Sequence, residues 1–320
     1  MARRSPRLSD LGETALIERI ARRAGRAPGA RWRLGIGDDA ALLAGRAGED
    51  LVFSTDTLVE GVHFRFAREG AWRVGRRALA VNLSDLAAMG AAPVGCLLGL
   101  CAPPDLAVAT FDAIVGGFAF EARRFACPLV GGNLSRATGC SLAVTVIGRV
   151  AAGRGLRRTG VVPGDLLFVT GVLGQAALRR HEADRAGGRL LHVPEPRLEA
   201  GRRLARLRET RACIDLSDGL ASDLGQLLRP AGVGARIAAS ALPSPPGFGA
   251  ACRRLGLDPL GLQVAGGEDY ELLFALAPSR LARDLAALSR RLGVRVSRIG
   301  EVVRGKGIEG LPRCDARHHF

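Results

Sequence analysis

The sequence predicts an α+β protein built from two domains, and three observations support this prediction. The chain has 320 residues, which is more than a single domain usually contains. Apolar residues make up 48% of it, enough to build the buried core of a globular protein. Strand-like and helix-like segments follow one another without the strict alternation that is typical of a doubly wound parallel sheet.

Apolar runs and turn residues predict the elements of the first half. Asp10 and Glu13 have the spacing of a capping box, so we expect a helix from there to about residue 24. The segment "WRVGRRALAVNLSDLAAMGA" (72–91) indicates a helix, a turn and the start of a second helix. The other expected elements are strands at 51–58, 94–103 and 141–150, a helix near 105–125, and an apolar run at 126–136 that ends in a Gly-Gly turn.

The stretch "AAGRGLRRTGVVPGD" (151–165) is the best candidate for a domain boundary, because it is rich in Gly and Arg and ends in Pro-Gly. We therefore expect one domain at 1–150 and another at 151–320. The elements expected in the second half are a strand at 166–171, a helix near 174–187, a loop at 192–197, a helix to about 209, a surface loop at 243–249, a turn and strand within 264–276, and an irregular tail.

Composition and missing motifs exclude several classes of protein. The net charge of +15 raises the possibility of nucleic-acid binding, but the arginines are scattered and only 4% of residues are aromatic, so we expect no nucleic-acid partner. Seven cysteines without a Cys-x-x-Cys motif favour reduced, buried thiols. No apolar run is long enough for a membrane span, and no leader peptide follows the basic start, so we expect a cytoplasmic protein.

Carboxylates concentrate at predicted turns, next to Gly, Ser or Thr. A Leu-Ser-Asp triplet occurs twice, at 83–85 and 216–218, each time at an expected entry into a helix. Each aspartate alone could be a helix cap. If the turns converge, like charges about 4 Å apart repel by roughly 4 kcal/mol per pair, which bound cations would offset. Oxygen ligands without clustered His or Cys select Mg²⁺, which also binds phosphates. These turns therefore predict a site for a metal–polyphosphate complex, although the P-loop and protein-kinase motifs are absent.

Seven long motifs, in this order, resemble those of the thiamine-monophosphate kinase family: "GIGDDAAL", "STDTLVEGVHF", "ALAVNLSDLAAMGA", "GGNLSR", "PEPRLEAG", "IDLSDGLASDLG" and "GGEDYELLF". The resemblance covers about residues 9 to 310. It implies the PurM-like fold of aminoimidazole ribonucleotide synthetase, with an N-terminal α+β domain whose sheet forms a dimer and a C-terminal α/β domain. It also implies ATP-dependent phosphorylation of thiamine monophosphate to thiamine diphosphate, with several Mg²⁺ ions and ATP as co-substrate.

The resemblance also implies roles for particular residues. Those that match catalytic positions are Asp56, Asp85 and Arg158. Those that match metal-binding positions are Asp39, Ser54, Thr55, Asp56, Asp85, Asn133, Asp215 and Asp218. Those that match ATP contacts are Gly132, Asn133, Arg158 and Ser217, and those that match contacts to the thiamine phosphate are His63, Glu268 and Phe320.

Several of these assignments have alternatives. Asp38 could replace Asp39, and Arg154 or Arg157 could replace Arg158. His63 could instead make a structural hydrogen bond at a strand end. Asp269 could either hold its turn or touch ligand. Asp223 fits an exposed helix position and is left out of the site.

Two departures from the family pattern affect the expected site. Asn133 stands where the family typically has Asp, which removes one negative charge from a metal site. The tail reads "RCDARHHF", where the family often supplies an aromatic residue, so Cys314 or Phe320 would take that place.

The acceptor is already an anionic phosphate, so we expect direct transfer without an essential general base. The alternative functions are another ATP-using enzyme of the same fold, similar to aminoimidazole ribonucleotide synthetase or selenophosphate synthetase, a nucleic-acid-binding protein, and a family member that binds ligand without catalysis.

Overall fold

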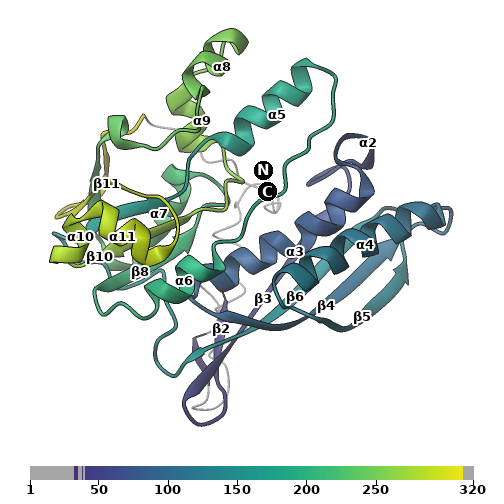
Figure 1. The fold of residues 1–320 in the computed structure, drawn as a ribbon, viewed down its shortest axis with the longest axis horizontal. Coiled ribbons are helices and arrows are strands. Elements are labelled where there is room, and N and C mark those ends of the chain that lie inside the picture. Colours follow the sequence, from purple (N-terminus) through teal and green to yellow (C-terminus); the bar gives the residue numbers. More distant parts are fainter. Residues whose placement is uncertain (1–31, 35–37, 39, 313–320) are drawn as a thin grey trace, which may run out of the picture.

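The structure is a computed structural model, and it describes residues 32–34, 38 and 40–312. In this part of the chain, two six-stranded sheets are each covered by helices, and the two sheets belong to different halves of the sequence (Figure 1). This arrangement is the α+β architecture expected from the sequence. The helix expected near 10–24 lies outside the described residues, as do Asp39, Cys314 and Phe320.

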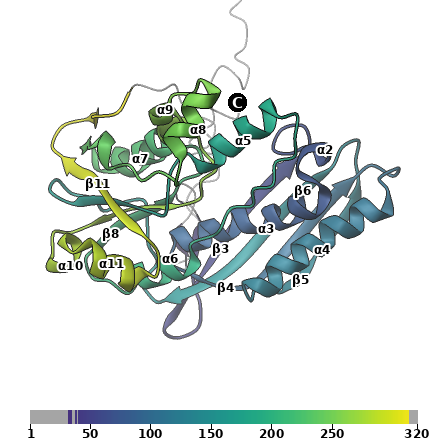
Figure 2. The same cartoon turned by 45° about the horizontal axis from the view of Figure 1, so that its top comes forward.

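The first sheet has the strand order β1-β2-β3-β6-β4-β5. All neighbouring strands are antiparallel except β4 and β5, which are parallel. Helices α3 and α4 cover one face of this sheet (Figures 1 and 2). The elements are β1 (Trp32–Leu34), β2 (Ala41–Ala44), β3 (Glu49–Val59), α2 (Phe66–Glu69), α3 (Ala71–Ala88), β4 (Ala92–Ala102), α4 (Val108–Arg124), β5 (Leu129–Arg136) and β6 (Ser141–Ala151).

Glycines let α3 and α4 pack with their backbones almost in contact. A Cβ atom on Gly75 of α3 would lie 1.9 Å from the carbonyl oxygen of Ile114. A Cβ atom on Gly117 of α4 would lie 1.9 Å from the carbonyl oxygen of Trp72. Because no side chain fits at either position, the sequence places glycine on both helices at the crossing.

The second sheet has the order β12-β9-β11-β7-β10-β8, and only the pair β12–β9 is parallel. Strands β7 and β10 are completely buried, so they are continuous apolar runs in the sequence. The elements are β7 (Leu166–Thr170), α5 (Gln175–Arg185), α6 (Leu198–Leu204), β8 (Thr210–Asp215), α7 (Leu220–Leu228), η2 (Arg229–Ala231), β9 (Gly234–Ile237), η3 (Ala239–Ala241), α8 (Phe248–Leu255), α9 (Pro259–Ala265), β10 (Leu272–Leu276), α10 (Arg280–Arg283), α11 (Leu285–Leu292), β11 (Val296–Val303) and β12 (Gly307–Glu309).

The largest hydrophobic cluster continues from one half of the chain into the other. It joins the buried side of α3 to Leu198 and Leu204 of α6 and to Phe168 and Phe274 of the second sheet. The two phenylalanine rings stack with their centroids 5.4 Å apart. A Cβ atom on Gly201 would lie 1.9 Å from the carbonyl oxygen of Ala87, so α6 lies directly on α3. Helix α3 is therefore part of the core of both halves.

Two local predictions were wrong. The segment expected to contain a turn is the single helix α3, so Ser84 and Asp85 lie in its last turns and not at a helix start. Asn82, within this segment, is buried and donates its side-chain N–H to the carbonyl oxygen of Ala78 at 2.9 Å. The Gly-Gly pair expected to end an apolar run lies inside β5, where a Cβ atom on Gly132 would lie 2.0 Å from the carbonyl oxygen of Leu98.

Two other predicted boundaries also differ. Helix α6 ends at Leu204, before the expected position near 209, and the expected irregular tail contains β12. The remaining strands and helices that were expected within 40–312 are present, with bounds shifted by a few residues. Within 40–312, no helix is both long and apolar enough to cross a membrane.

Candidate active site

Strand β3 and helix α3 bring two predicted metal-binding residues, Ser54 and Asp85, into contact. Ser54 of β3 donates its Oγ–H to Oδ2 of Asp85 at 2.5 Å. The backbone N–H of Asp56 donates to Oδ1 of Asn82 at 2.9 Å. Asn82 and Asp85 are three residues apart on α3, so they lie on the same face of the helix. This face aligns the polar end of β3 with the polar end of α3.

The same helix contacts the second half of the chain through a buried hydrogen bond. Ser84 donates its Oγ–H to Oδ2 of Asp215, the last residue of β8, at 2.6 Å. Ser84 has no exposed surface, and Asp215 is 3% exposed. Aspartates from β3, α3 and β8 therefore gather around the last turns of α3, although they come from both halves of the sequence.

Asp223 corrects a prediction, because it is buried and not exposed. Its Oδ2 accepts hydrogen bonds from the backbone N–H groups of Asp218 at 3.2 Å and Gly219 at 3.1 Å. Burial raises the pKa of Asp223 well above its usual value, and the charges of Asp218 and Asp215 raise it further. Asp223 thus fixes the turn between β8 and α7 that presents Asp218.

Electrostatic effects also link the two halves. The Tyr270 hydroxyl has a pKa raised well above its usual value, first by burial, and the carboxylates of Asp56 and Asp215 contribute. The Tyr270 hydroxyl therefore interacts electrostatically with one aspartate from each half of the chain. Within 40–312, no three His, Cys, Asp or Glu side chains already form a metal-binding group. The donors that do gather are all oxygens, which fits Mg²⁺ and not a softer metal.

Two predicted site residues on the first sheet lie apart from this group or point elsewhere. The hydroxyl of Thr55 donates to the carbonyl oxygen of Val144 at 3.0 Å. Asn133 is exposed on β5 and donates its side-chain N–H to the hydroxyl of Ser135 at 2.8 Å. Register places Asn133 three strand spacings from Thr57, about 14 Å across the sheet. Within one chain, Gly132 and Asn133 are therefore not brought beside Asp56.

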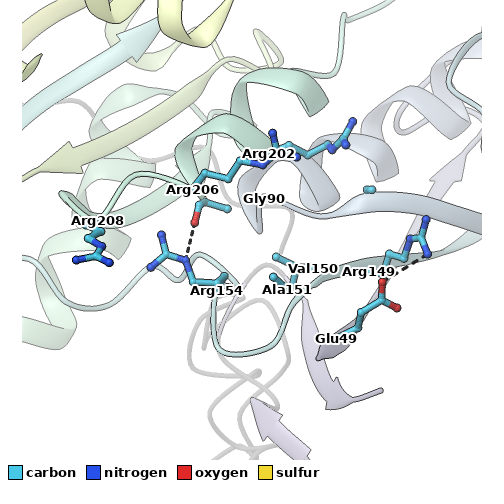
Figure 3. Close-up of a pocket in the computed structure, with 11 residues that line it drawn as sticks. Glu49, Gly90, Arg149, Val150, Ala151, Arg154, Arg202, Arg206 and Arg208 are labelled. Atoms are coloured by element: carbon cyan, nitrogen blue, oxygen red, sulfur yellow. Dashed lines mark hydrogen bonds and ion pairs between the residues drawn. The ribbon is translucent and has the colours of Figure 1, made fainter. Parts of the chain in front are cut away.

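The three candidate arginines around residue 158 point to different places. Arg158 donates from Nη1 to Oε1 of Gln226 on α7 at 2.6 Å, and its backbone N–H donates to Oδ2 of Asp38 at 3.3 Å. Arg154 instead donates from Nε to the carbonyl oxygen of Ala205 at 2.9 Å, on another surface (Figure 3). Arg157 is exposed. Arg158 is thus the one of the three that the structure ties to Asp38 and α7.

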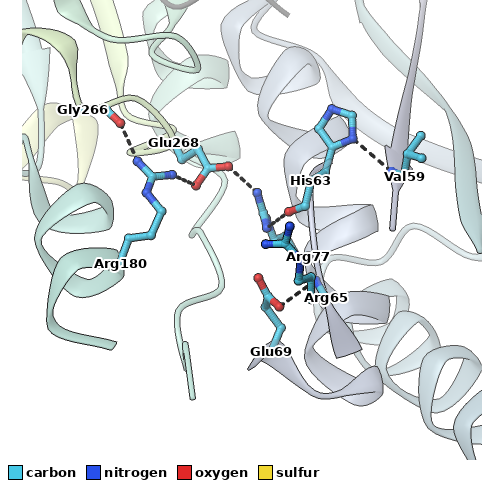
Figure 4. A network of polar contacts seen from close by, with 8 residues as sticks. All are labelled: Val59, His63, Arg65, Glu69, Arg77, Arg180, Gly266 and Glu268. Atoms are coloured by element: carbon cyan, nitrogen blue, oxygen red, sulfur yellow. Dashed lines mark hydrogen bonds and ion pairs between the residues drawn. The ribbon is translucent and has the colours of Figure 1, made fainter. Parts of the chain in front are cut away.

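Glu268 lies between two arginines from different halves of the chain (Figure 4). Arg180 of α5 donates from Nη1 to one carboxylate oxygen of Glu268 at 2.5 Å, and Arg77 of α3 donates to the other. Arg77 also donates to the carbonyl oxygen of His63 at 2.8 Å. The His63 ring accepts a hydrogen bond at Nδ1 from the backbone N–H of Val59 at 3.0 Å, which is the structural bond considered from the sequence. His63 and Glu268 are therefore joined by one polar network.

The residues that follow Glu268 hold the loop in place. Asp269 accepts hydrogen bonds from the backbone N–H groups of Gly174 at 2.6 Å and Ala176 at 3.0 Å, at the start of α5. Burial raises the pKa of Asp269 to about 6. Arg197 donates from Nε and Nη2 to the two oxygens of the buried Glu271 carboxylate, at 2.7 and 2.5 Å. Arg197 belongs to the motif "PEPRLEAG", so the structure explains that motif by this buried ion pair.

Several polar residues that organise the site were not predicted from the sequence. Asn82 precedes the first Leu-Ser-Asp triplet and Ser84 is its second residue, and their spacing on a continuous helix would have indicated their positions. Asp223 lies five residues after Asp218, and a similar spacing is found where an acidic side chain in the first turn of a helix accepts hydrogen bonds from the backbone N–H groups before that helix. The arginines that pair with Glu268 gave no local signal, because Arg77 is 191 residues away.

Comparison with known proteins assigns this architecture to a class. Residues 37–150 match the family model of the AIR synthase related protein, N-terminal domain, and residues 162–311 match the model of its C-terminal domain. Together the two models cover most of the chain.

Similarity to individual proteins identifies the family. The thiamine-monophosphate kinase of Synechococcus elongatus is 38% identical over 284 residues, which is 83% of each chain. The crystal structure of thiamine-monophosphate kinase from Stenotrophomonas maltophilia is 38% identical with a TM-score of 0.73, and covers 93% of this chain and 96% of that one. A structure titled AaThiL complexed with AMPPCP and TMP has a TM-score of 0.83 at 28% identity and covers 99% of both chains. The chain belongs to the thiamine-monophosphate kinase family.

Proposed function

We propose that this protein transfers the γ-phosphoryl group of ATP to thiamine monophosphate and so forms thiamine diphosphate. The observation that carries the proposal is the gathering of aspartates from both halves around the last turns of α3, in a chain of this family. The similar protein whose title names bound AMPPCP and TMP supports the same pair of substrates. The acceptor phosphate is anionic, so the protein has to position two charged groups in line more than it has to remove a proton.

Mg²⁺ ions, when bound, would offset the charge of the triphosphate and of the aspartates. The side chains proposed to hold them supply only oxygen atoms. Ser54 and Ser84 already orient two of these carboxylates, and Asp223 orients the turn of a third. The proposed metal ligands are Asp39, Ser54, Thr55, Asp56, Asp85, Asn133, Asp215 and Asp218.

The substrate assignments follow from the family and from the polar network of Glu268. We propose ATP contacts at Gly132, Asn133, Arg158 and Ser217. For thiamine monophosphate the proposed contacts are His63, Glu268 and Phe320. Asp56, Asp85 and Arg158 act on the transferred group through metal and charge.

We also propose a cytoplasmic homodimer with domains at 1–150 and 151–320. Strand β5 is at the edge of the first sheet, and its Leu129, Val130 and Leu134 are exposed. An edge strand with apolar side chains is suited to pair with another sheet. Five of the six described cysteines are buried, which fits reduced thiols in a reducing compartment.

The test is a coupled assay with Mg-ATP and thiamine monophosphate, with thiamine as the control acceptor. We expect turnover with the monophosphate and none with thiamine. Replacing Asp56 or Asp85 with Asn should lower turnover at least about 100-fold, because each removes a negative charge from the group that would hold metal. Asp112→Asn on the exposed surface of α4 makes the same charge change and should keep wild-type turnover.

The proposal fails if purified protein forms no thiamine diphosphate, or if product analysis shows phosphate on a different acceptor. Near-normal activity of Asp56→Asn would remove that residue from the metal site. Circular dichroism spectra of all variants should match the wild type, which shows that lost activity is not lost folding.

A further inference from the structure

An arginine-rich cavity lies where the two halves of the chain meet, away from the aspartates. Its volume is about 620 Å³, within the range of small-molecule sites. One wall is formed by the ends of β3 and β6, and the other by α6 and the segment that follows it (Figure 3). The lining residues are Glu49, Gly90, Ala92, Arg149, Val150, Ala151, Arg154, Arg202, Ala205, Arg206 and Arg208.

The charge of this cavity exceeds what the basic composition of the chain would produce. Arginine supplies five of its eleven lining residues, whereas Lys and Arg together make up 46 of the 320 residues, about one in seven. Glu49 is the one acidic lining residue, and it accepts a hydrogen bond from Arg149 at 3.5 Å. The cavity therefore carries a formal charge of +4, five arginines less one glutamate.

Three of these arginines have no acidic partner among the described residues: Arg154, Arg206 and Arg208. Arg154 donates to the carbonyl oxygens of Ala205 at 2.9 Å and Leu207 at 3.3 Å, and Arg202 pairs with Glu199 at 3.2 Å. No residue within 40–312 accepts a hydrogen bond or forms an ion pair with the side chain of Arg206 or Arg208. A smaller cavity of about 150 Å³ shares Arg154 and Arg208 and adds Arg157 and Arg211 at its rim. Like charges gathered in this way favour an anionic ligand.

Strand geometry separates this cavity from the candidate active site. Glu49 lies at the opposite end of β3 from Asp56, seven residues and roughly 23 Å away along the strand. Arg149 is five residues from Val144, which is the partner of Asp56 on β6. Arg158, the arginine assigned to the active site, contacts Asp38 and Gln226 and does not line either cavity.

We propose that this cavity is a second ligand site, which binds a small molecule that carries a chain of two or more phosphate groups. The guanidinium groups of Arg206 and Arg208 bind phosphate oxygens, since planar guanidinium donors match phosphate geometry. The volume and a charge of +4 suit a di- or triphosphate better than a single phosphate ion. Because the walls come from both halves and Gly90 directly follows the α3 cap, the ligand stabilises the packing of the two halves.

The test is isothermal titration calorimetry of the full chain with inorganic tripolyphosphate, in EDTA. Without divalent cations, the aspartates of the active site repel a polyphosphate, whereas the arginine cavity needs no metal. We expect one tripolyphosphate per chain, with orthophosphate at least about 10-fold weaker. The variant Arg206→Ala/Arg208→Ala should bind tripolyphosphate at least about 30-fold more weakly, because two charge-assisted contacts are lost. A parallel titration with ATP in EDTA separates a nucleotide from an inorganic chain. Binding of either one supports the site when the variant Arg206→Ala/Arg208→Ala weakens it.

The matched control is Arg253→Ala/Arg304→Ala, which removes two exposed arginines from α8 and from the turn after β11. This variant has the same net charge as the test variant and should bind as wild type does. Both variants should keep wild-type kinase turnover in the coupled assay, so failure of the second site is distinguishable from failure of the kinase. Equal affinity of the two double variants, or no binding by wild type at millimolar tripolyphosphate, would overturn the proposal.

Discussion

Replacing Ser84 with Ala tests the contact that joins α3 to the second half of the chain. The change removes one oxygen atom, which donates to Asp215 at 2.6 Å, and creates almost no cavity. A hydrogen bond to a charged acceptor contributes about 1.5–3 kcal/mol, and Ala in place of Ser in a helix returns up to about 0.5 kcal/mol. The net loss in the free energy of unfolding should therefore be about 1–2.5 kcal/mol.

This loss translates into a measurable change in Tm. An entropy of unfolding of roughly 2.1 cal/mol/K per residue over the 320 residues gives a fall of about 1.5–4 °C. The assay is thermal unfolding followed by circular dichroism in metal-free buffer. The matched control is Ser222→Ala on α7, where no described residue is hydrogen-bonded to the serine hydroxyl, and its Tm should stay the same or rise. A Tm for Ser84→Ala at or above wild type would refute the reasoning.

Three further predictions concern packing and buried charge. Gly117→Ala should lower the free energy of unfolding by about 1–3 kcal/mol, because the new Cβ would lie 1.9 Å from a backbone oxygen. Gly116→Ala on the same helix meets nothing within 4 Å, so it should raise the free energy of unfolding, and urea unfolding of both variants measures the difference. Arg197→Met leaves Glu271 buried without its cation, so the urea midpoint should fall by an amount equivalent to about 3–5 kcal/mol, and an unchanged midpoint would argue against the ion pair. The Asp269 pKa is raised from 3.8 to about 6, so between these values the folded state binds the proton more tightly than the unfolded state does. The stability that this proton contributes is present at low pH and is lost as the pH rises through 6. Relative to Asp269→Asn, wild-type stability should fall by up to about 3 kcal/mol from pH 3.5 to pH 7, and a flat difference would contradict the shift.

The sequence was sufficient for elements whose pattern depends on their own residues. Strands β7 and β10 are buried on both sides, so their apolar runs were visible without knowledge of the neighbours. Asp215 ends a buried strand and Asp218 lies in the turn before a helix, so this strand-to-helix turn was predictable. The prediction that aspartates from both halves approach one another came from the affinity of clustered carboxylates for Mg²⁺ and not from any sequence pattern. The contacts of Ser54 with Asp85 and of Ser84 with Asp215 agree with that arrangement.

The errors come from contacts between distant residues. Helix α3 continues through Asn82, whose buried side chain donates to the Ala78 carbonyl one turn earlier and to which the backbone N–H of Asp56 on β3 donates. Gly132, the second residue of the Gly-Gly pair in β5, is required by the carbonyl oxygen of Leu98 on the neighbouring strand. Asp223 is buried because two N–H groups of the preceding turn bind its carboxylate. In each case the residue type was consistent with a loop or surface position, and tertiary structure gave it another role.

The continuous core around α3 has a consequence for separating the protein into fragments. The sequence has a natural cutting point at 151–165, but Leu198 and Leu204 from beyond it pack in the same cluster as α3. A fragment that ends at this point would expose the apolar surface that α6 covers, and the complementary fragment would expose α6. We therefore expect each fragment to aggregate when it is expressed alone. When the two fragments are co-expressed, we expect them to associate as a non-covalent complex.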